Sequence, residues 1–325
     1  MTVPPNIQTC WILTDGKIGM VNQCRALARA LGLDPEMKTV DLRAPWCWLP
    51  PRLTPARTGV VTPDSTPLAP PWPDLLIATG RKSVAPARAI RRASGGHTFC
   101  VQIQAPGVAP GAFDVVVAPA HDRLDGANVI STIGSMQGID HAALEDARAA
   151  FAGRVAPLPH PRVAVLLGGD NGVFRFTRAR ADSLAAQLRD LAAKRNVGLM
   201  VTPSRRTPGF AVDAIKGALD GLEADIWDET GANPYLGFLA HADAIIVTGD
   251  SVNMVSEAVA TGKPVHVVPL EGGSRKFARF HEAMTARGFT RPFSGALESW
   301  TYEPPDDMAV VVTEIQRRMA AAHRS

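Results

Sequence analysis

The stretch VTGDSVNMVSEAVATGKPVHVVPLEGG, residues 247–273, has the pattern of a β-strand, a short helix and a second β-strand. It begins apolar, turns at Gly249 and becomes apolar again after Gly262. Asp250 or Ser251 can cap the helix start with a side-chain oxygen, and Gly262 suits its end. Because a parallel β-α-β unit is covered on both faces, the remaining polar residues of this stretch need a further explanation.

Three polar residues of the short helix are not explained by capping, namely Asn253, Ser256 and Glu257. Asn253 and Glu257 have the i, i+4 spacing that places two side chains on one helix face. The free backbone N–H groups at a helix start bind phosphate, and a glutamate farther along can accept two hydrogen bonds from a ribose diol. We therefore predict a ligand site at this helix.

The same alternation of strands and helices extends over most of the chain and predicts the fold class. Apolar strands are expected at 9–14, 38–42, 74–79, 98–104, 113–119 and 128–133, and later at 162–169, 197–204, 224–228, 243–249 and 264–269. Helices are expected near 20–31, 83–93, 140–151, 177–194 and 212–222. This order is typical of parallel sheets with helices on both faces. We therefore predict an α/β protein with two doubly wound, Rossmann-like β/α domains facing a cleft.

Prolines indicate where the domains begin and end. The proline-rich segment 45–73 is expected to be irregular, and GRVAPLPHPR at 153–162 suits a linker. We predict an N-terminal domain at 1–155, a C-terminal domain at 156–305 and a last helix at 306–325, which packs back on the N-terminal domain. Acidic residues open this last helix and arginines close it, which matches the helix dipole.

Composition narrows the class of protein. Of the 325 residues, 46% are hydrophobic and 20% are charged, as in soluble globular proteins. No apolar run reaches the ~18 residues that a membrane-spanning helix needs, and the first residues lack the pattern of a signal peptide. The four cysteines have neither metal-binding nor redox spacing. We therefore expect a cytoplasmic protein.

The net charge is +3, and the basic excess lies chiefly in GRKSVAPARAIRR at 80–92, which has five basic and no acidic residues. This segment is too small for a nucleic-acid-binding surface, and no nucleic-acid-binding motif accompanies it. An anionic ligand or an anionic membrane surface fits it better. A membrane partner would place the protein peripherally, at the inner face of the membrane.

Polar residues follow two strands of the first domain, at the strand ends where doubly wound sheets bind ligands. Asp15 and Lys17 come after the first strand, where Asp15 is a candidate general base and Lys17 a candidate anion contact. Arg81 and Lys82 come after a later strand and face a helix start. A plain β-α turn and a solvated basic surface are the alternative explanations.

Two loops of the second domain suit phosphate. Gly168 and Gly169 follow its first strand, where glycines allow the backbone to approach phosphate closely. Tight turning alone is the alternative. In TPSRRTP at 202–208, Arg205 and Arg206 stand between two prolines and would form a rigid fork for phosphate oxygens.

Four stretches together resemble one known family: TDGKIGMVNQCRALARALG, TPSRRTP, GDSVNMVSEAVATGKPV and RPFSGALESWTYEPPDD. The chain is similar over nearly its whole length to the "elongated mitochondria" family of mitochondrial fission proteins, which has bacterial members. A plant member helps to bring a dynamin-related protein to the mitochondrial surface. The resemblance therefore implies a recruiting role at a membrane.

The pattern formed by Glu257-Ala258 and Gly262-Lys263-Pro264 also resembles the donor-binding unit of GT-B glycosyltransferases. One of these enzymes adds N-acetylglucosamine to a lipid-linked muramyl peptide. By this resemblance the proposed donor-binding residues are Gly168, Gly169, Arg205, Arg206, Ser251, Asn253 and Glu257, with Ser251 and Asn253 on the diphosphate and Glu257 on the ribose. Ser274, in EGGSRKF at 271–277, falls where GT-B enzymes contact the sugar or the acceptor.

The first functional hypothesis is a GT-B-type glycosyltransferase that uses a nucleotide-diphosphate sugar. The donor would bind the C-terminal domain and a lipid-linked or envelope glycan acceptor the N-terminal one. GT-B chemistry generally needs no metal, because basic residues and helix dipoles stabilise the departing diphosphate, so we expect neither metal nor cofactor beyond the substrate. Asp15 is the first candidate base and His121, in PAHDRL, the second; a structural role is the alternative for His121.

The second hypothesis is a non-catalytic scaffold of GT-B fold that recruits a partner to a membrane surface. In APWCWLPPRL at 44–53, two tryptophans and Leu49 stand among prolines beside Arg43 and Arg52 and could insert at an interface. Core packing of the tryptophans is the alternative. A third hypothesis, an epimerase or other dinucleotide enzyme, lacks support because neither GxGxxG nor a Tyr-x-x-x-Lys couple is present.

Overall fold

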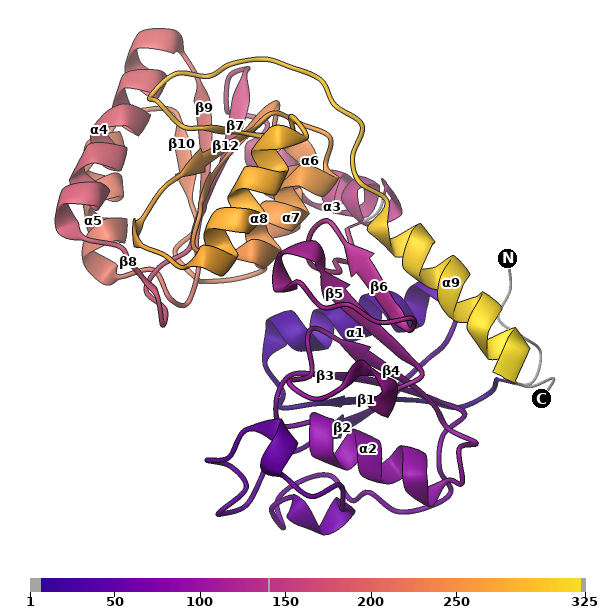
Figure 1. Ribbon diagram of the computed structural model, residues 1–325. Helices are drawn as coiled ribbons and strands as arrows, with labels where there is room; N and C mark the ends of the chain where they lie inside the picture. Colours follow the sequence, from indigo (N-terminus) through magenta and orange to yellow (C-terminus); the bar gives the residue numbers. More distant parts are fainter. Residues whose placement is uncertain (1–6, 140, 323–325) are drawn as a thin grey trace. The chain divides into compact units, whose positions relative to one another are not determined.

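A computed structural model describes residues 7–139 and 141–322 of the chain. The described residues form two compact units, each built around its own parallel sheet (Figure 1). Unit 1 contains the chain up to 138 together with the segment from 306 onward, and unit 2 contains 139–305. The prediction of two Rossmann-like β/α domains is confirmed. No helix among the described residues is long and apolar enough to cross a membrane.

The sheet of unit 1 has the strand order β2-β1-β3-β4-β5-β6, and all neighbours run parallel. Its strands are β1 (Cys10–Thr14), β2 (Glu36–Thr39), β3 (Leu75–Thr79), β4 (Phe99–Ile103), β5 (Val115–Pro119) and β6 (Val129–Thr132). Its helices are α1 (Ile18–Ala30), α2 (Val84–Ala93) and α9 (Asp307–Ala322). The strands β1, β3, β4 and β5 are buried along their whole length, which explains their unbroken apolar sequences. The proline-rich segment 45–73 contributes only short 3-10 turns (Pro51–Leu53 and Thr58–Val60) and one isolated bridge.

Helix α9 belongs to the core of unit 1. Its residues Val311, Ile315 and Met319 are almost completely buried in the same apolar cluster as residues of α1. At its start, the Asp307 carboxylate accepts hydrogen bonds from the backbone N–H groups of the loop after β6, at 133 and 134. Figure 1 shows the chain returning to unit 1 in this helix.

The sheet of unit 2 has the strand order β10-β9-β7-β11-β12-β14, again with parallel neighbours. Its strands are β7 (Arg162–Leu167), β9 (Gly198–Pro203), β10 (Ala224–Ile226), β11 (Ala244–Thr248), β12 (Val265–Val268) and β14 (Thr290–Pro292). Its helices are α3 (His141–Val155), α4 (Arg178–Arg195), α5 (Gly209–Leu219), α6 (Tyr235–His241), α7 (Val252–Ala260) and α8 (Arg275–Ala286). A separate antiparallel pair joins β8 (Phe174–Arg175) to β13 (Glu271–Gly272).

The structure differs from the sequence-based prediction in two places. Helix α3, which the predicted boundary at 155 assigned to the first domain, lies in unit 2. It contacts α6, and the Arg154 guanidinium forms two hydrogen bonds with the Asp225 carboxylate of β10, at 2.6 and 2.8 Å. The segment EGGSRKF was predicted as a loop, but α8 begins within it at Arg275, and neither α8 nor β14 was expected.

The contact between α3 and α6 gives a test of packing. A Cβ atom added at Gly237 in α6 would lie 2.5 Å from the ring of Phe151 in α3, so we expect Gly237→Ala to lower the free energy of unfolding by about 1–3 kcal/mol. The matched control is Gly217→Ala in α5, where a Cβ would meet nothing within 4 Å. That change should raise the free energy of unfolding by about 0.5–1 kcal/mol. Urea denaturation of both variants checks the difference, and equal effects would contradict it.

Candidate functional site

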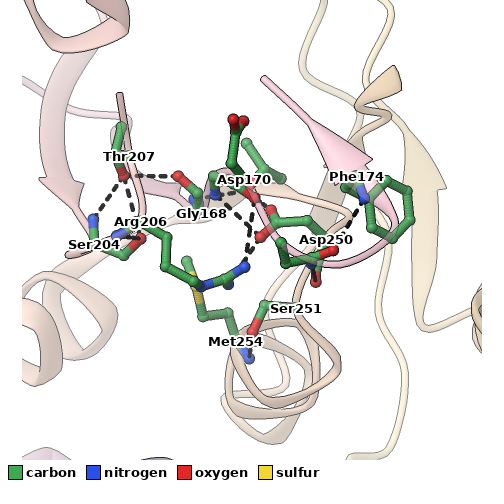
Figure 2. A network of polar contacts seen from close by, with 12 residues as sticks. Gly168, Asp170, Phe174, Ser204, Arg206, Thr207, Asp250, Ser251 and Met254 are labelled. Atoms are coloured by element: carbon green, nitrogen blue, oxygen red, sulfur yellow. Dashed lines mark hydrogen bonds and ion pairs between the residues drawn. The ribbon is translucent and has the colours of Figure 1, made fainter. Parts of the chain in front are cut away.

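Three adjacent strands of unit 2 end side by side, and their following loops meet (Figure 2). β9, β7 and β11 are neighbours in the sheet and parallel, so their carboxyl ends lie at one edge. Gly168 follows β7, Ser204 follows β9 and Gly249 follows β11. The structure thus brings together three of the loops that the sequence singled out.

The Asp250 carboxylate lies at the centre of these loops and is completely buried. Its Oδ1 accepts the Thr248 hydroxyl at 2.7 Å, and its Oδ2 accepts the Gly169 backbone N–H at 3.0 Å. The Arg206 guanidinium forms an ion pair with Oδ2 at 2.8 Å. A buried carboxylate needs such partners, because transfer of an unpaired charge out of water is costly. Asp250 is therefore the residue that joins the three loops (Figure 2).

Asp250 does not cap helix α7, which corrects one of the two capping assignments considered for the sequence. The cap is Ser251, whose hydroxyl accepts the backbone N–H of Met254 at 3.3 Å. Asp250 points instead toward the β7 and β9 loops (Figure 2). Gly262 ends the helix with a positive φ of 72°, as expected of a C-terminal glycine.

Gly168 and Gly169 are required by packing within the protein. A Cβ atom at Gly168 would lie 2.1 Å from the Asp250 carboxylate, and one at Gly169 would lie 1.8 Å from the backbone oxygen of Arg206. Close approach of Asp250 and of the Arg206 backbone therefore accounts for both glycines, and neither has the positive φ of a turn glycine. A contact between these glycines and phosphate stays a prediction.

The loop after β9 holds two arginines in different environments. Thr207 fixes the loop to the end of β7, because its hydroxyl lies 2.9 Å from the Leu167 carbonyl and 2.7 Å from that of Gly168. The Arg206 guanidinium pairs with Asp250 through Nη2 and donates to the Gly169 carbonyl through Nη1 at 3.4 Å, yet 38% of its side chain remains exposed. Arg205 is exposed and makes no hydrogen bond or ion pair with any other described residue. The loop thus presents positive charge to solvent beside the start of α7.

Glu257 has a partner that the sequence analysis did not identify. The Tyr235 hydroxyl, at the start of α6, donates a hydrogen bond to Glu257 Oε2 at 2.5 Å. Burial raises the pKa of Glu257, and burial together with the neighbouring carboxylate raises the pKa of Tyr235 well above its ordinary value. Both residues are half-buried as a whole, with their paired polar groups on the buried side. Asn253 lies in the first turn of the same helix and is also partly exposed.

Ser274 caps helix α8 by accepting the Phe277 backbone N–H at 3.4 Å. The loop before it pairs with the loop after β7, since β13 and β8 form a two-stranded sheet. A hydrogen bond of 2.6 Å from the Thr177 hydroxyl to the Glu271 carboxylate strengthens this connection. Ser274 also lines a cavity under α8.

The candidate residues of unit 1 are largely occupied by contacts within the fold. Arg81 donates to the backbone carbonyls at 47 and 49, at 2.6 and 2.8 Å, and so holds the proline-rich segment. Lys82 forms an ion pair of 2.7 Å with Asp41 and lowers the pKa of that carboxyl. Both cations thus have partners within the fold, whereas a role in anion binding stays a prediction.

The two candidate bases also lie in unit 1. The Asp15 carboxylate is 6% exposed and pairs with the exposed Lys17 ammonium at 2.8 Å. His121 is 5% exposed, in a 3-10 turn (Ala120–Asp122) after β5, with Nε2 3.9 Å from the Asp122 carboxylate. Among the described residues no group of three or more His, Cys, Asp or Glu side chains could hold a metal ion.

Comparison with solved structures identifies the fold class. A UDP-GlcNAc 2-epimerase from Methanocaldococcus jannaschii matches with a TM-score of 0.55 at 12% identity, covering 98% of this chain and 92% of that chain. MurG from Acinetobacter baumannii matches at 0.51 and 13% identity, with coverages of 97% and 93%. A UDP-GlcNAc 2-epimerase from Neisseria meningitidis, bound to UDP-GlcNAc, matches at 0.51 and 13% identity, with coverages of 97% and 94%. The fold is therefore the GT-B type found in nucleotide-sugar enzymes.

Comparison of sequences identifies the family. The family model described as "Mitochondrial fission ELM1" matches residues 18–319, and the chain belongs to this family. The mitochondrial fission protein ELM1 of Arabidopsis thaliana is 34% identical over 276 residues, which are 77% of this chain and 64% of the plant protein. An uncharacterized protein of Rickettsia prowazekii, RP120, is 28% identical over 280 residues, or 75% of this chain and 78% of that protein. The predicted membership of the fission family is confirmed.

The network around Asp250 predicts a loss of stability when its carboxylate is removed. Asp250→Ala should lower the free energy of unfolding by about 2–4 kcal/mol, because three donors lose a charged acceptor. The control is Asp190→Ala, which removes an exposed carboxylate paired with Lys194 at 2.9 Å and should change the free energy by no more than about 0.5 kcal/mol. Urea denaturation of the full chain compares the two. A loss from Asp250→Ala as small as the control's would show that the network does not hold the loops together.

Proposed function

We propose that unit 2 binds a nucleoside diphosphate sugar and that the protein transfers the sugar without a metal ion. The observation that carries the proposal is the Arg206 guanidinium, held by the buried Asp250 carboxylate beside the start of helix α7. A fixed cation next to a helix N-terminus is an arrangement that binds phosphate. The GT-B fold of the nucleotide-sugar enzymes is consistent with this ligand class.

The diphosphate would bind between the start of α7 and the arginine loop. Arg205 offers a whole guanidinium, and Arg206 offers the N–H groups that Asp250 and the Gly169 carbonyl do not use. Asp250 supports this role, because it holds Arg206 in one orientation and reduces the side-chain entropy lost when a ligand binds. Ser251 and Asn253 are in the first turn of α7 and would complete the contact.

The ribose would bind Glu257. Tyr235 occupies Oε2 of the carboxylate, which leaves Oε1 as the acceptor for a ribose hydroxyl. The tyrosine also holds the carboxylate in one rotamer, so that the ribose meets a preorganised acceptor. Tyr235 is therefore a positioning residue for the proposed ribose contact.

The arginines and the dipole of α7 would stabilise the negative charge that develops on the leaving diphosphate. Asp15 is the preferred candidate for the base that activates the acceptor hydroxyl, and His121 is the second. We propose a lipid-linked or envelope glycan as the acceptor. Because proteins named as epimerases and as MurG share this fold, the products must be analysed for epimerised sugar as well as for transfer.

Nucleotide-sugar binding is tested with the full chain and millimolar UDP-, GDP-, ADP- and CMP-sugars. At a ligand concentration of 100 times Kd, one of them should stabilise the protein by about 2.7 kcal/mol, seen as a rise in Tm. Glu257→Gln and Arg205→Ala should each weaken this ligand at least about tenfold, since each removes a charged hydrogen-bonding partner.

Arg195→Ala is the matched control for Arg205→Ala. Arg195 is likewise exposed, but it ends α4 before β9 begins, at the opposite edge of the sheet from the arginine loop. Its loss should leave the affinity unchanged. Absence of a Tm shift with every sugar nucleotide would overturn the proposed donor site, and an unchanged affinity in Glu257→Gln would overturn the ribose contact.

We also propose that unit 1 contacts an anionic membrane surface, which would suit either an enzyme with a lipid acceptor or a recruiting scaffold. Trp48 is 77% exposed and Leu53 is 57% exposed, and Arg43 and Arg52 beside them are exposed as well. Trp46 is instead packed against Leu42 and Val60, so only one of the two tryptophans is available. Arg81 donates hydrogen bonds to the backbone carbonyls on both sides of Trp48 and so fixes this part of the segment.

Vesicle binding tests the membrane contact. The protein should cosediment with vesicles that contain anionic phosphatidylglycerol and bind vesicles of phosphatidylcholine alone much more weakly. Trp48→Ala should reduce binding about tenfold or more, because an indole at the interface contributes buried area. Val310→Ala, which removes a 60% exposed valine of α9, is the control and should bind as the unchanged protein does. Equal binding by Trp48→Ala and Val310→Ala would exclude the segment as the contact.

A further inference from the structure

The last turns of helix α2 contribute to a basic pocket in unit 1. Helix α2 begins after the carboxyl end of β3 and ends before the amino end of β4, so the pocket lies at the amino edge of the parallel sheet, opposite to the edge that carries Asp15. Its volume of about 360 Å³ is within the range of small-molecule sites. The lining residues are Arg88, Arg91, Arg92, Gly95, Gly96 and Ala112.

The three arginines of the pocket are not needed to form the helix. They have the spacing i, i+3 and i+4, which places their side chains on one helix face, where like charges destabilise a helix. They are also not needed to cap it. The last backbone carbonyls, those of Ile90, Arg91 and Arg92, already accept backbone N–H groups of the following turn at 2.9–3.1 Å. The clustering of the arginines therefore needs another explanation.

The positive charge of the pocket is only partly neutralised by the described residues. Arg91 donates to the Asp114 carboxylate from Nε at 3.0 Å and from Nη2 at 2.7 Å. Asp114 also accepts the backbone N–H of Cys100 at 2.7 Å, which fixes the carboxylate. The guanidinium groups of Arg88 and Arg92 form no hydrogen bond or ion pair with any other described residue. Two of the three positive charges therefore have no carboxylate partner within the described structure.

The charge and the donors of the pocket indicate what kind of anion fits it. Guanidinium groups match the oxygens of phosphate and carboxylate, because their N–H donors have a fixed planar geometry. A phosphate monoester has about two negative charges at neutral pH and three strong acceptor oxygens, whereas a carboxylate has one charge and two oxygens. Arg88 is half-buried and Arg92 is exposed, so both can be reached from solvent. Two unpaired guanidinium groups therefore favour the phosphate monoester.

We infer that this pocket binds the phosphate group of a phosphate monoester, with Arg88 and Arg92 donating hydrogen bonds to its oxygens and Arg91 adding to the positive charge. None of these residues belongs to the proposed nucleotide-sugar site of unit 2. The pocket is also apart from the proposed membrane segment around Trp48, because Arg81 holds that segment at the start of α2 and the pocket is at its end. The phosphate belongs to a soluble molecule or to a lipid headgroup, and the experiment below separates these two sources.

Titration calorimetry of the full chain with glycerol 3-phosphate tests the site. Binding should be saturable, and glycerate, in which a carboxylate replaces the phosphate ester, should bind at least about tenfold more weakly. Absence of saturable binding at millimolar glycerol 3-phosphate would overturn the site, and equal affinity for the two ligands would overturn the preference for phosphate. No sugar nucleotide is present, so the result is separate from that of the donor-site test.

Two double variants locate the bound phosphate. Arg88→Ala with Arg92→Ala should weaken glycerol 3-phosphate at least about tenfold, because two charged donors are lost. The matched control is Arg25→Ala with Arg29→Ala. Arg25 and Arg29 are exposed and stand at the same distances from the end of α1 as Arg88 and Arg92 do from the end of α2, but they lie outside the pocket. Each double variant removes two positive charges, so equal losses of affinity would show an effect of net charge alone and overturn the pocket.

A further variant separates the pocket from the arginine loop of unit 2. Arg205→Ala should bind glycerol 3-phosphate as the unchanged protein does, because Arg205 is not part of the pocket. A loss of binding in Arg205→Ala, with normal binding in the Arg88 and Arg92 double variant, would place the phosphate in unit 2 and overturn the inference.

Vesicles identify the source of the phosphate. Phosphatidic acid has a phosphate monoester as its headgroup, whereas phosphatidylglycerol has a diester. If the ligand is a lipid, the protein should cosediment more strongly with phosphatidic acid vesicles than with phosphatidylglycerol vesicles of equal total charge, and the Arg88 and Arg92 double variant should lose this preference. Equal cosedimentation, together with binding of glycerol 3-phosphate, supports a soluble ligand. A preference for phosphatidic acid that the double variant retains would overturn the pocket as the lipid site.

Discussion

The arrangement of unit 2 depends on one buried carboxylate. Asp250 follows the central strand β11 and is completely withdrawn from water, so its charge must be met by donors from the neighbouring loops. It obtains them from its own strand, from the turn after β7 and from the loop after β9. The two glycines after β7 follow from this requirement, because any side chain at Gly168 would occupy the position of the carboxylate. One acidic residue therefore determines the shape of the surface on which Arg206 is presented.

Periodicity alone predicted most of the fold. The buried strands of both sheets have unbroken apolar sequences, and their order along the chain required two doubly wound units. The features that the sequence did not predict depend on contacts between residues that are distant in the chain. Helix α3 belongs to unit 2 because Phe151 packs over Gly237 and Arg154 pairs with Asp225, and these partners are distant in sequence. Strand β14 has the sequence Thr-Arg-Pro, which contains no apolar run that would indicate a buried strand.

The sequence singled out three loops that meet in the structure, but it did not give the contacts between them. Local rules limited the helix start to Asp250 or Ser251 and gave the glycine at its end. They could not decide between Asp250 and Ser251 as the cap, because the partners of Asp250 come from two other strands. For the same reason the sequence did not reveal the partners of Arg81 and Lys82, because the oxygen atoms that they contact belong to residues distant in sequence. The pairing of Tyr235 with Glu257 joins two helices and has no local signal.

The position of α9 affects the order in which the two units can fold during synthesis. Unit 1 is discontinuous in sequence, since all of unit 2 is inserted between its β6 and α9. The apolar side chains of α9 complete the same cluster that α1 begins. On a ribosome, which releases the chain from its amino end, unit 2 can therefore close its core before unit 1 can. Until α9 has been synthesised, the apolar residues of unit 1 that it packs against remain exposed. During this interval a chaperone would bind that apolar surface.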